Sequence, residues 1–330
     1  MQRVLVCPAF NAYYYSLYVQ GIFEAFHGAR IRFSSRPFPP FASNKLAFIV
    51  RADSETRFLV DATDRSSLDL EALAWSNVYG KVNRLSSAVP IESARKVLPI
   101  GPSFPCRIGG LLTSWVRAFA YYFRARRGLE STREHFANWR RQYKYALPER
   151  AFQPGQSRDR FVFSSNTLWK ADMETNRLRA AFFESCRSIE GLDFEGGFTP
   201  RHDGHVPGFE QYSLPRRYPI REYVEKTKQA AVVFNTPAVF ECHGFKLGEY
   251  LALGKAIIST PLKRELPSPL VDGEHIHFVS SPEGIREAIR QLLADRQYRA
   301  RLEAGARAYY CEYLRPRRVI ERLLNASRAL

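Results

Sequence analysis

The chain has 330 residues, of which 45% are hydrophobic and 14% aromatic, so it can bury a large core and is not a disordered segment. Its 49 Lys and Arg against 33 Asp and Glu give a net charge of +16, which favours polyanionic partners: nucleic acid, an anionic bilayer surface or phosphate-bearing small molecules. No apolar run is long enough to span a membrane, and the five scattered cysteines include no C-x-x-C pair, which argues against a disulfide framework or structural zinc. We therefore expect a cytoplasmic protein.

The first half of the chain alternates short apolar strands with helical patterns. A polar stretch at 148–160, which contains Pro154 and Gly155, is typical of a linker and puts the domain boundary near residue 150. Strands are predicted at residues 4–6, 31–33, 46–50, 58–61 and 97–100, and helices at 14–26 and 67–75.

The second half repeats this alternation more regularly. Because parallel strands require crossover connections, the alternation predicts a parallel sheet in each half. The sequence thus predicts an α/β protein of two domains, 1–150 and 151–312, that face a cleft, with a terminal helix at 313–330. The elements predicted here are strands at 161–163, 231–234, 256–259 and 275–279, helices at 173–186, 223–229, 246–253, 282–293 and from 298 onwards, and turn-rich sequence at 191–219.

A basic, aromatic segment at residues 108–144 has two interpretations. Between Arg117 and Lys144 there are eight Lys or Arg and two Glu, and large apolar groups recur just upstream at spacings of three and four. Such a stripe beside dense Arg is typical of a helix that lies in a bilayer interface. The alternative is a core-facing amphipathic helix with a solvated basic end. Since no nucleic-acid-binding motif is recognisable, we expect a peripheral association with an anionic membrane at its inner face, and not nucleic acid.

The segment from residue 231 to 261 contains the strongest candidate site. A buried strand is followed by a turn with Gly244, where the backbone can approach a ligand closely, and then by a helix. In open α/β sheets, ligands bind at the carboxyl ends of strands, and helix N-termini offer N–H groups to phosphate. Glu241 in the loop and Glu249 on the helix can accept hydrogen bonds from sugar diols. We expect the helix start to hold a diphosphate, Glu249 to bind ribose hydroxyls and Glu241 the transferred sugar; the alternative is two solvated carboxylates.

Two neighbours of Gly244 add to this candidate site. Lys246 is a candidate phosphate ligand, because a cation at a helix start is otherwise unfavourable to the dipole. His243 lies beside the presumed phosphate turn and can donate to a sugar or diphosphate. Phe245 stands between the turn and Lys246 and is included among the donor-binding residues.

The ordered pattern from residue 231 to 324 resembles the C-terminal domain of GT-B glycosyltransferases, particularly the retaining group like family 4. It consists of Glu-x-x-Gly-x-x-x-x-Glu at 241–249, a Leu/Ala-rich helix that ends at Gly254, and an apolar strand that ends in Ser-Thr-Pro at 259–261. The resemblance implies two Rossmann-like domains, a nucleotide-diphosphate sugar held mostly by the second, and a terminal helix that returns to the first. It also implies sugar transfer with retention, without a metal ion or a cofactor.

The family commonly places an Arg and a Lys after the first strand of this domain, to neutralise the diphosphate. Lys170 matches the lysine, whereas Ser or Asn stands at the arginine position, and Arg177 or Arg179 is a possible substitute. The alternative is that these cations are solvated charges on a helix surface.

The N-terminal domain of the family contributes the acceptor site and a Gly-rich loop after its first strand, but this chain has no Gly there until Gly21. Tyrosines in the run that replaces the loop can stack on sugars or belong to the core. Asp64, after a predicted strand, is a candidate base or hydroxyl anchor, or alternatively a helix N-cap. The acceptor-side or cleft candidates are Asn11, Tyr15, Lys81 and Asn83.

These observations predict a metal-independent glycosyltransferase of the hexosyltransferase kind, with Glu241 and Asp64 as catalytic residues. The expected acceptor is a glycan or a lipid-linked glycan of envelope polysaccharide assembly. Two alternatives remain: a sugar-nucleotide epimerase of the same fold, and a basic nucleic-acid-binding protein.

Overall fold

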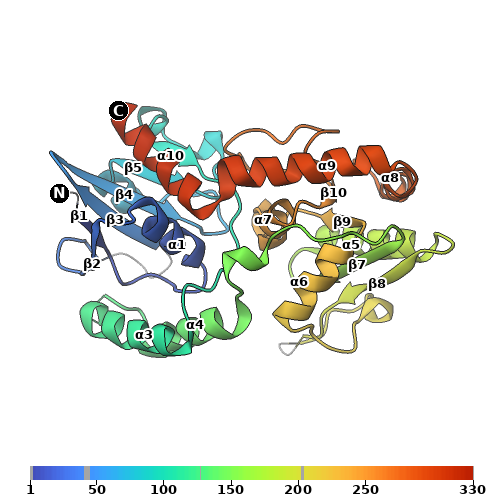
Figure 1. Cartoon of the computed structure of the whole chain (residues 1–330), viewed down its shortest axis with the longest axis horizontal. Helices are drawn as coiled ribbons and strands as arrows, with labels where there is room; N and C mark the ends of the chain where they lie inside the picture. The colour runs from blue at the N-terminus through green and yellow to red at the C-terminus, as the bar shows by residue number, and fades with distance from the viewer. Residues whose placement is uncertain (1–2, 41–44, 127, 202–203, 330) are drawn as a thin grey trace. The chain divides into compact units, whose positions relative to one another are not determined.

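The protein is described by a computed structural model at residues 3–40, 45–126, 128–201 and 204–329, and it divides into two compact units (Figure 1). Unit 1 comprises residues 1–151, 264–268 and 312–330, and unit 2 comprises residues 152–263 and 269–311. The short excursion at 264–268 clusters with unit 1, where Glu265 forms an ion pair with Arg84. Each unit combines a sheet with helices, which confirms the α/β class.

Unit 1 is built on a six-stranded sheet in the order β2-β1-β3-β4-β5-β6. The prediction of an all-parallel sheet is wrong here, because β3 runs antiparallel to both of its neighbours. The physical reason is local: three residues join β3 to β4, which is enough for a hairpin but far too few for a crossover. The strands are β1 (Arg3–Val6), β2 (Arg30–Phe33), β3 (Lys45–Arg51), β4 (Glu55–Asp61), β5 (Val78–Lys81) and β6 (Val97–Pro99).

Helix α10, at the C-terminal end of the chain, packs on α1 within unit 1 (Figure 1). The two helices approach closely at Gly21, where an added Cβ would lie 2.1 Å from the carbonyl oxygen of Pro316. Pro316 begins α10, a position at which its missing N–H is not needed. The helices of this unit are α1 (Ser16–Ala25), α2 (Leu70–Trp75), α3 (Leu111–Ala125), α4 (Thr132–Tyr145) and α10 (Pro316–Ala329), with short 3-10 turns at Ser86–Ala88, Ile91–Ser93 and Glu149–Ala151.

All strand pairs in the described part of unit 2 are parallel, as the alternating pattern predicts. Its pairs are β7 (Phe161–Asn166) with β8 (Asp193–Phe198), and β9 (Val232–Asn235) with β10 (Ala256–Ser259), which also pairs with β11 (His277–Phe278). A hydrogen bond of 2.7 Å from the Ala231 N–H to the Phe161 carbonyl links the start of β9 to β7. The helices are α5 (Met173–Arg187), α6 (Ile220–Gln229), α7 (Phe245–Ala252), α8 (Pro282–Ala294) and α9 (Arg296–Tyr309), and irregular turns occur at Glu210–Tyr212, Val239–Glu241 and Tyr310–Leu314.

Strand β8 is absent from the sequence prediction, which treats residues 191–219 as turns. Its two glycines, Gly196 and Gly197, are poor strand formers and conceal it from a propensity argument. Both are required by close packing, since an added Cβ would lie 2.7 Å from the Ser164 carbonyl at one position and 2.2 Å from the Tyr212 carbonyl at the other.

The core of unit 2 holds β9 and β10 rigidly. Both strands are fully buried, and the ring of Phe234 on β9 stacks on Phe182 of α5 with centroids 4.8 Å apart. This packing fixes the carboxyl end of β9, from which the loop to α7 departs. Within the described residues, no helix combines the length and the apolar content needed to cross a membrane.

Candidate functional site

A pocket of about 290 Å³ opens in unit 2 where β7 and β9 end and α7 begins. Strands β7 and β9 belong to two neighbouring parallel sheets that the hydrogen bond from Ala231 to Phe161 links, and the residues after both strands line the pocket. The carboxyl ends of parallel strands are where α/β proteins bind ligands. Five of the predicted donor-binding residues line this pocket, which the structure therefore brings together: Arg179, Gly244, Phe245, Lys246 and Glu249.

Arg179 on α5 is a buried cation at the pocket wall. Its Nε donates to Thr236 Oγ1 at 3.1 Å, and its Nη1 donates to the Thr167 carbonyl at 2.8 Å. Burial lowers the pKa of its guanidinium to about 10. Its hydrogen-bond acceptors are both neutral, and no carboxylate of the described chain lies within 4.0 Å of it, although the charge of Asp172 acts on it from further away. The position therefore has spare capacity for an anion.

Lys246 and Glu249 on α7 are linked through a tyrosine that the sequence analysis does not identify. Lys246 Nζ donates to the Tyr223 hydroxyl at 3.0 Å, and that hydroxyl donates to Glu249 Oε2 at 2.8 Å. Burial lowers the pKa of Lys246 to about 8; the charge of Glu249 opposes this shift and that of Arg179 adds to it. Burial also raises the pKa of Glu249, against the opposing effects of Lys246 and Tyr223. The lining thus contains two basic side chains and one acidic side chain.

The loop before α7 has an unusual backbone. Phe240 and Glu241 both lie in the left-handed region, with φ of 58° and 59°, which costs roughly 1–3 kcal/mol for each such residue. Gly244 then begins the helix without a side-chain acceptor for its first amides. A helix start of this kind carries partial positive charge, which favours an anion.

The other predicted donor-binding residues lie outside the pocket lining. Glu241 and Lys170 are exposed, and neither lines the pocket, although each has partners elsewhere. His243 is buried beside Gly244 but does not line the pocket either. The two acids of the 241–249 pattern therefore differ: Glu249 faces the pocket and Glu241 does not.

Several polar residues of the pocket lining are not among the site residues predicted from the sequence. Strands β7 and β9 each end at an Asn that a Thr follows, at residues 166–167 and 235–236, and all four residues line the pocket. A search for polar residues directly after buried strands would have found them, because that is where α/β sheets bind ligands. Tyr223 gives no such signal, since its hydroxyl reaches the pocket from α6.

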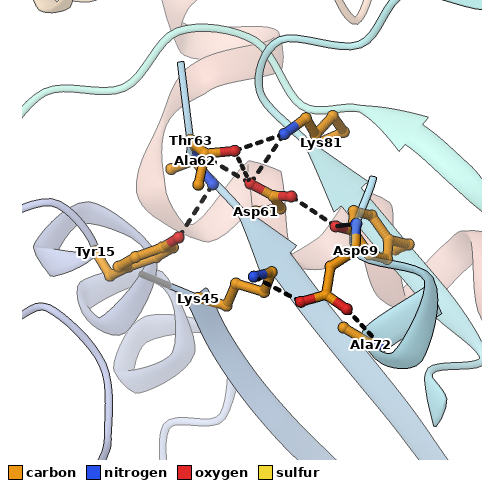
Figure 2. Close-up of polar contacts among 9 residues, drawn as sticks. Tyr15, Lys45, Asp61, Ala62, Thr63, Asp69, Ala72 and Lys81 are labelled. Carbon is orange, nitrogen blue, oxygen red and sulfur yellow. Dashed lines mark hydrogen bonds and ion pairs between the residues drawn. The ribbon is translucent and has the colours of Figure 1, made fainter. Parts of the chain in front are cut away.

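Two of the predicted residues of unit 1, Tyr15 and Lys81, belong to a buried polar network around Asp61 (Figure 2). Asp61 accepts hydrogen bonds from the Tyr79 hydroxyl at 2.6 Å and from Thr63, and it pairs with Lys81 at 3.0 Å. Burial lowers the pKa of Lys81, and the charge of Asp61 opposes that shift. The Tyr15 hydroxyl accepts from the Ala62 N–H at 3.2 Å. These contacts hold the loop after β4 in place.

Asn11, Asn83 and Asp64 occupy different environments. Asn11 Oδ1 accepts from the N–H groups of Tyr13 and Tyr14, at 3.0 and 3.2 Å, and so shapes its own turn. Asn83 is buried and donates to the Thr63 carbonyl at 2.9 Å. Asp64 is exposed. The alternative of a helix N-cap at Asp64 is wrong, because the cap of α2 is Asp69.

No group of three or more His, Cys, Asp or Glu side chains in the parts of the chain that the structure describes is arranged to hold a metal ion.

Residues 179–325 match the protein-family model described as "Glycosyl transferase-like". The match covers rather less than half of the chain and includes Arg179, Tyr223, Lys246 and Glu249. Comparison with curated proteins gives no match.

Among solved structures, the chain is similar to TarM, with 13% identity, a TM-score of 0.40, and coverage of 52% of this chain but only 36% of TarM. It is also similar to HepE from Anabaena in complex with UDP-glucose, with 11% identity, a TM-score of 0.40 and coverage of 77% and 79%. For the spinosyn forosaminyltransferase SpnP the identity is 12%, the TM-score 0.40, and the coverage 98% of both chains. Sequence identity and structural similarity are low in all three comparisons.

Proposed function

Since residues 179–325 match the glycosyl transferase-like family model, we propose that this protein is a glycosyltransferase that binds a nucleotide-diphosphate sugar in the pocket of unit 2. The observation that carries the proposal is the excess of positive charge in the pocket lining. Arg179 is buried and Lys246 half-buried, and Glu249 is the only acidic lining residue of the described chain. Burial of a charge is costly unless it is well compensated, and a diphosphate supplies negative charge beyond that of Glu249 and of Asp172, whose charge also acts on Arg179.

The geometry suits a diphosphate in two further respects. A guanidinium presents several N–H donors in a fixed plane, and the donors of Arg179 that its two neutral acceptors leave over can bind phosphate oxygens. The start of α7, which has no side-chain cap, adds backbone N–H groups and the positive end of the helix dipole.

Glu249 is proposed to bind the ribose. Its carboxylate accepts one hydrogen bond from Tyr223 and retains acceptor capacity for a diol. The distance of one helical turn between Lys246 and Glu249 lets the phosphate and the ribose of one nucleotide contact the same helix.

In the reaction we propose, an acceptor hydroxyl oxygen forms a bond to the anomeric carbon, the bond from that carbon to the diphosphate oxygen breaks, and the hydroxyl proton passes to the leaving diphosphate. Negative charge grows on that diphosphate as its bond breaks. Arg179 and Lys246, already oriented by their hydrogen bonds, stabilise that charge without a metal ion. The proposal includes GT-B architecture for the whole chain and transfer of a hexose with retention to a glycan or lipid-linked acceptor. These finer points rest on the resemblance of residues 231–324 to the retaining group. The roles of Glu241 and Asp64 in catalysis remain predictions.

Calorimetric titration with a panel of uridine and guanosine diphosphate sugars tests the proposal. We expect Arg179→Gln to weaken binding by about 10- to 100-fold, since a hydrogen bond to a charged group contributes about 1.5–3 kcal/mol. The matched control is Arg177→Gln, which removes an exposed positive charge from the same helix and should leave affinity unchanged. Arg179→Lys keeps the charge, and far-UV circular dichroism reports whether each variant folds.

Three results would contradict the proposal or redirect it. Absence of binding to every nucleotide sugar, or equal affinity of the folded Arg179→Gln variant, would overturn it. Steeply salt-dependent binding of DNA or RNA would favour a nucleic-acid-binding protein. Conversion of the donor alone into an epimer would identify a sugar-nucleotide epimerase.

A further inference from the structure

Helix α3 presents a row of large apolar side chains to solvent. We call Leu112, Val116, Phe119 and Phe123 the outer stripe; they are 78%, 59%, 51% and 66% exposed. Their spacing of four, three and four residues places them on one face of the helix. The opposite face, with Ser114, Ala118, Tyr121 and Ala125, is buried in unit 1. The helix is thus anchored by one face, while a second apolar face is largely exposed, although Phe119 also contacts the ring of Phe136 on α4 with centroids 5.1 Å apart. A contiguous exposed patch of this kind marks an interaction site.

A second apolar feature lies beside the outer stripe, where α3 and α4 pack side by side (Figure 1). A pocket of about 240 Å³ opens between the start of α3 and the end of α4. Aromatic and aliphatic side chains form most of its wall, which also includes two positively charged side chains. The lining includes Leu111, Trp115, Trp139, Tyr143, Arg140 and Lys144.

The two helices and their connection are strongly basic. Residues 111–145 contain eight Lys or Arg and only two Glu; Arg127 is one of the eight and lies outside the described residues. One of the two acids, Glu134, pairs with Arg141 at 3.0 Å. The exposed cations are Arg124, Arg126, Arg133, Arg140, Arg141 and Lys144.

We propose that α3 and α4 seat unit 1 on a bilayer that contains anionic phospholipids, with the outer stripe at the boundary of headgroups and acyl chains. An apolar face of Leu, Val and Phe with a Trp at its edge, surrounded by Arg and Lys, is what such an interface binds. The basic side chains then meet lipid phosphates, while their aliphatic stems cover apolar surface.

The positive charge of this surface favours an anionic bilayer over a second copy of the chain as its binding partner. A symmetric dimer through this face would bring two strongly positive surfaces together, and like charges across an interface oppose association. An anionic membrane supplies the opposite charge and an apolar layer at the same time. The inference concerns a surface remote in sequence from the pocket of unit 2, and it does not depend on the proposed enzymatic activity.

Co-sedimentation of the full chain with vesicles tests the inference. Two vesicle types are used: phosphatidylcholine alone, and phosphatidylcholine with phosphatidylglycerol in equal amounts. We expect the chain to sediment with the second type, less so at high salt, and the triple variant Leu112→Ser, Val116→Ser, Phe123→Ser to bind about tenfold or more weakly. The matched control is Leu70→Ser with Ile91→Ser, which removes side chains that are 68% and 91% exposed elsewhere in unit 1.

A second pair of variants tests how much the positive charge of this surface contributes to vesicle binding. Arg124→Gln with Arg126→Gln should weaken binding to anionic vesicles, whereas Arg286→Gln with Arg290→Gln, an equal charge change on the exposed side of α8, should leave it unchanged. The inference is overturned if the wild-type chain does not bind anionic vesicles, or if the triple variant binds as well as the control. Concentration-dependent dimerisation in sedimentation velocity that the triple variant abolishes, without vesicle binding, would assign the face to a second copy instead.

Discussion

Arg179, Lys246, Tyr223 and Glu249 form the polar part of the pocket in unit 2, and each depends on its neighbours for its charge state. Tyr223 is central, because its hydroxyl accepts from Lys246 and donates to Glu249. Arg179 has no charged hydrogen-bond acceptor among the described residues, since it donates to a hydroxyl and a carbonyl. An anion that binds here would lower the cost of burying both cations.

The pH dependence of donor binding follows from Lys246. Its pKa of about 8 means that the side chain is mostly charged below pH 8 and loses its proton above it. A diphosphate prefers the charged form, so we expect affinity to fall as pH rises through 8 and proton uptake to accompany binding there. Calorimetry on either side of pH 8, in buffers of different ionisation enthalpy, measures both effects.

Lys246→Arg provides the comparison for this prediction, because a guanidinium keeps its charge to much higher pH. The ligand's own ionisation affects both proteins equally, so it cancels when their pH profiles of affinity are compared. Identical pH profiles for the wild-type chain and a folded Lys246→Arg variant would show that Lys246 does not contact the anion.

At the scale of elements, the contact of α1 with α10 depends on the absence of a side chain at residue 21. An added Cβ at Gly21 would lie 2.1 Å from the Pro316 carbonyl oxygen and 2.9 Å from the Ile320 side chain. The clash is with backbone on one side, so relief requires the helices to separate. Helices α1 and α10, which are far apart in sequence, therefore pack closely at Gly21 only because this residue has no side chain.

Gly21→Ala is therefore expected to destabilise the protein, by about 1–3 kcal/mol, as overpacking usually does. Gly284→Ala is the matched control, since Gly284 is also helical but an added Cβ there makes only ordinary contacts of 3.7 Å or more. We expect that control to be neutral or more stable by up to about 1 kcal/mol. Chemical denaturation measures both changes, and an undiminished free energy of unfolding for Gly21→Ala would refute the close approach.

The loop between β9 and α7 is the element that the sequence describes best. The apolar strand, the turn with Gly244 and the helix with Lys246 and Glu249 all follow from local pattern, and the structure brings Gly244, Lys246 and Glu249 to one pocket. The left-handed conformations of Phe240 and Glu241 do not follow, because neither residue type prefers that region. Glu241 is exposed and does not line the pocket.

At the scale of the whole molecule, each unit owns a separate core, although the chain passes between the units several times. Unit 1 is completed only by residues 312–330, which are remote in sequence from its sheet. Val319, Ile320 and Leu323 of α10 are fully buried there. Burial of each contributes about 1.5–3 kcal/mol, a large share of the 5–15 kcal/mol that is typical of a domain.

Deletion of residues 312–330 should therefore unfold unit 1 and leave unit 2 folded. Hydrogen exchange followed by mass spectrometry is expected to show lost protection in β3 and β4 and retained protection in β9 and β10. Arg317→Gln with Arg318→Gln changes only exposed residues of the same helix and should keep both units protected. Undiminished protection of β3 and β4 in the truncated chain would show that unit 1 folds without α10.

The sequence by itself determined the α/β class, the parallel strands of unit 2 and the strand–turn–helix segment with Lys246 and Glu249. Periodicity, turn chemistry and helix starts act over a few residues, so a local pattern is sufficient for them. Only the tertiary structure decided the direction of β3, the presence of β8 and the choice of Arg179 over Lys170 at the pocket. The same holds for Tyr223, which contacts Glu249 across 26 positions of the chain. Burial and pairing of a charge depend on such distant neighbours, whose contacts arise only when the chain packs.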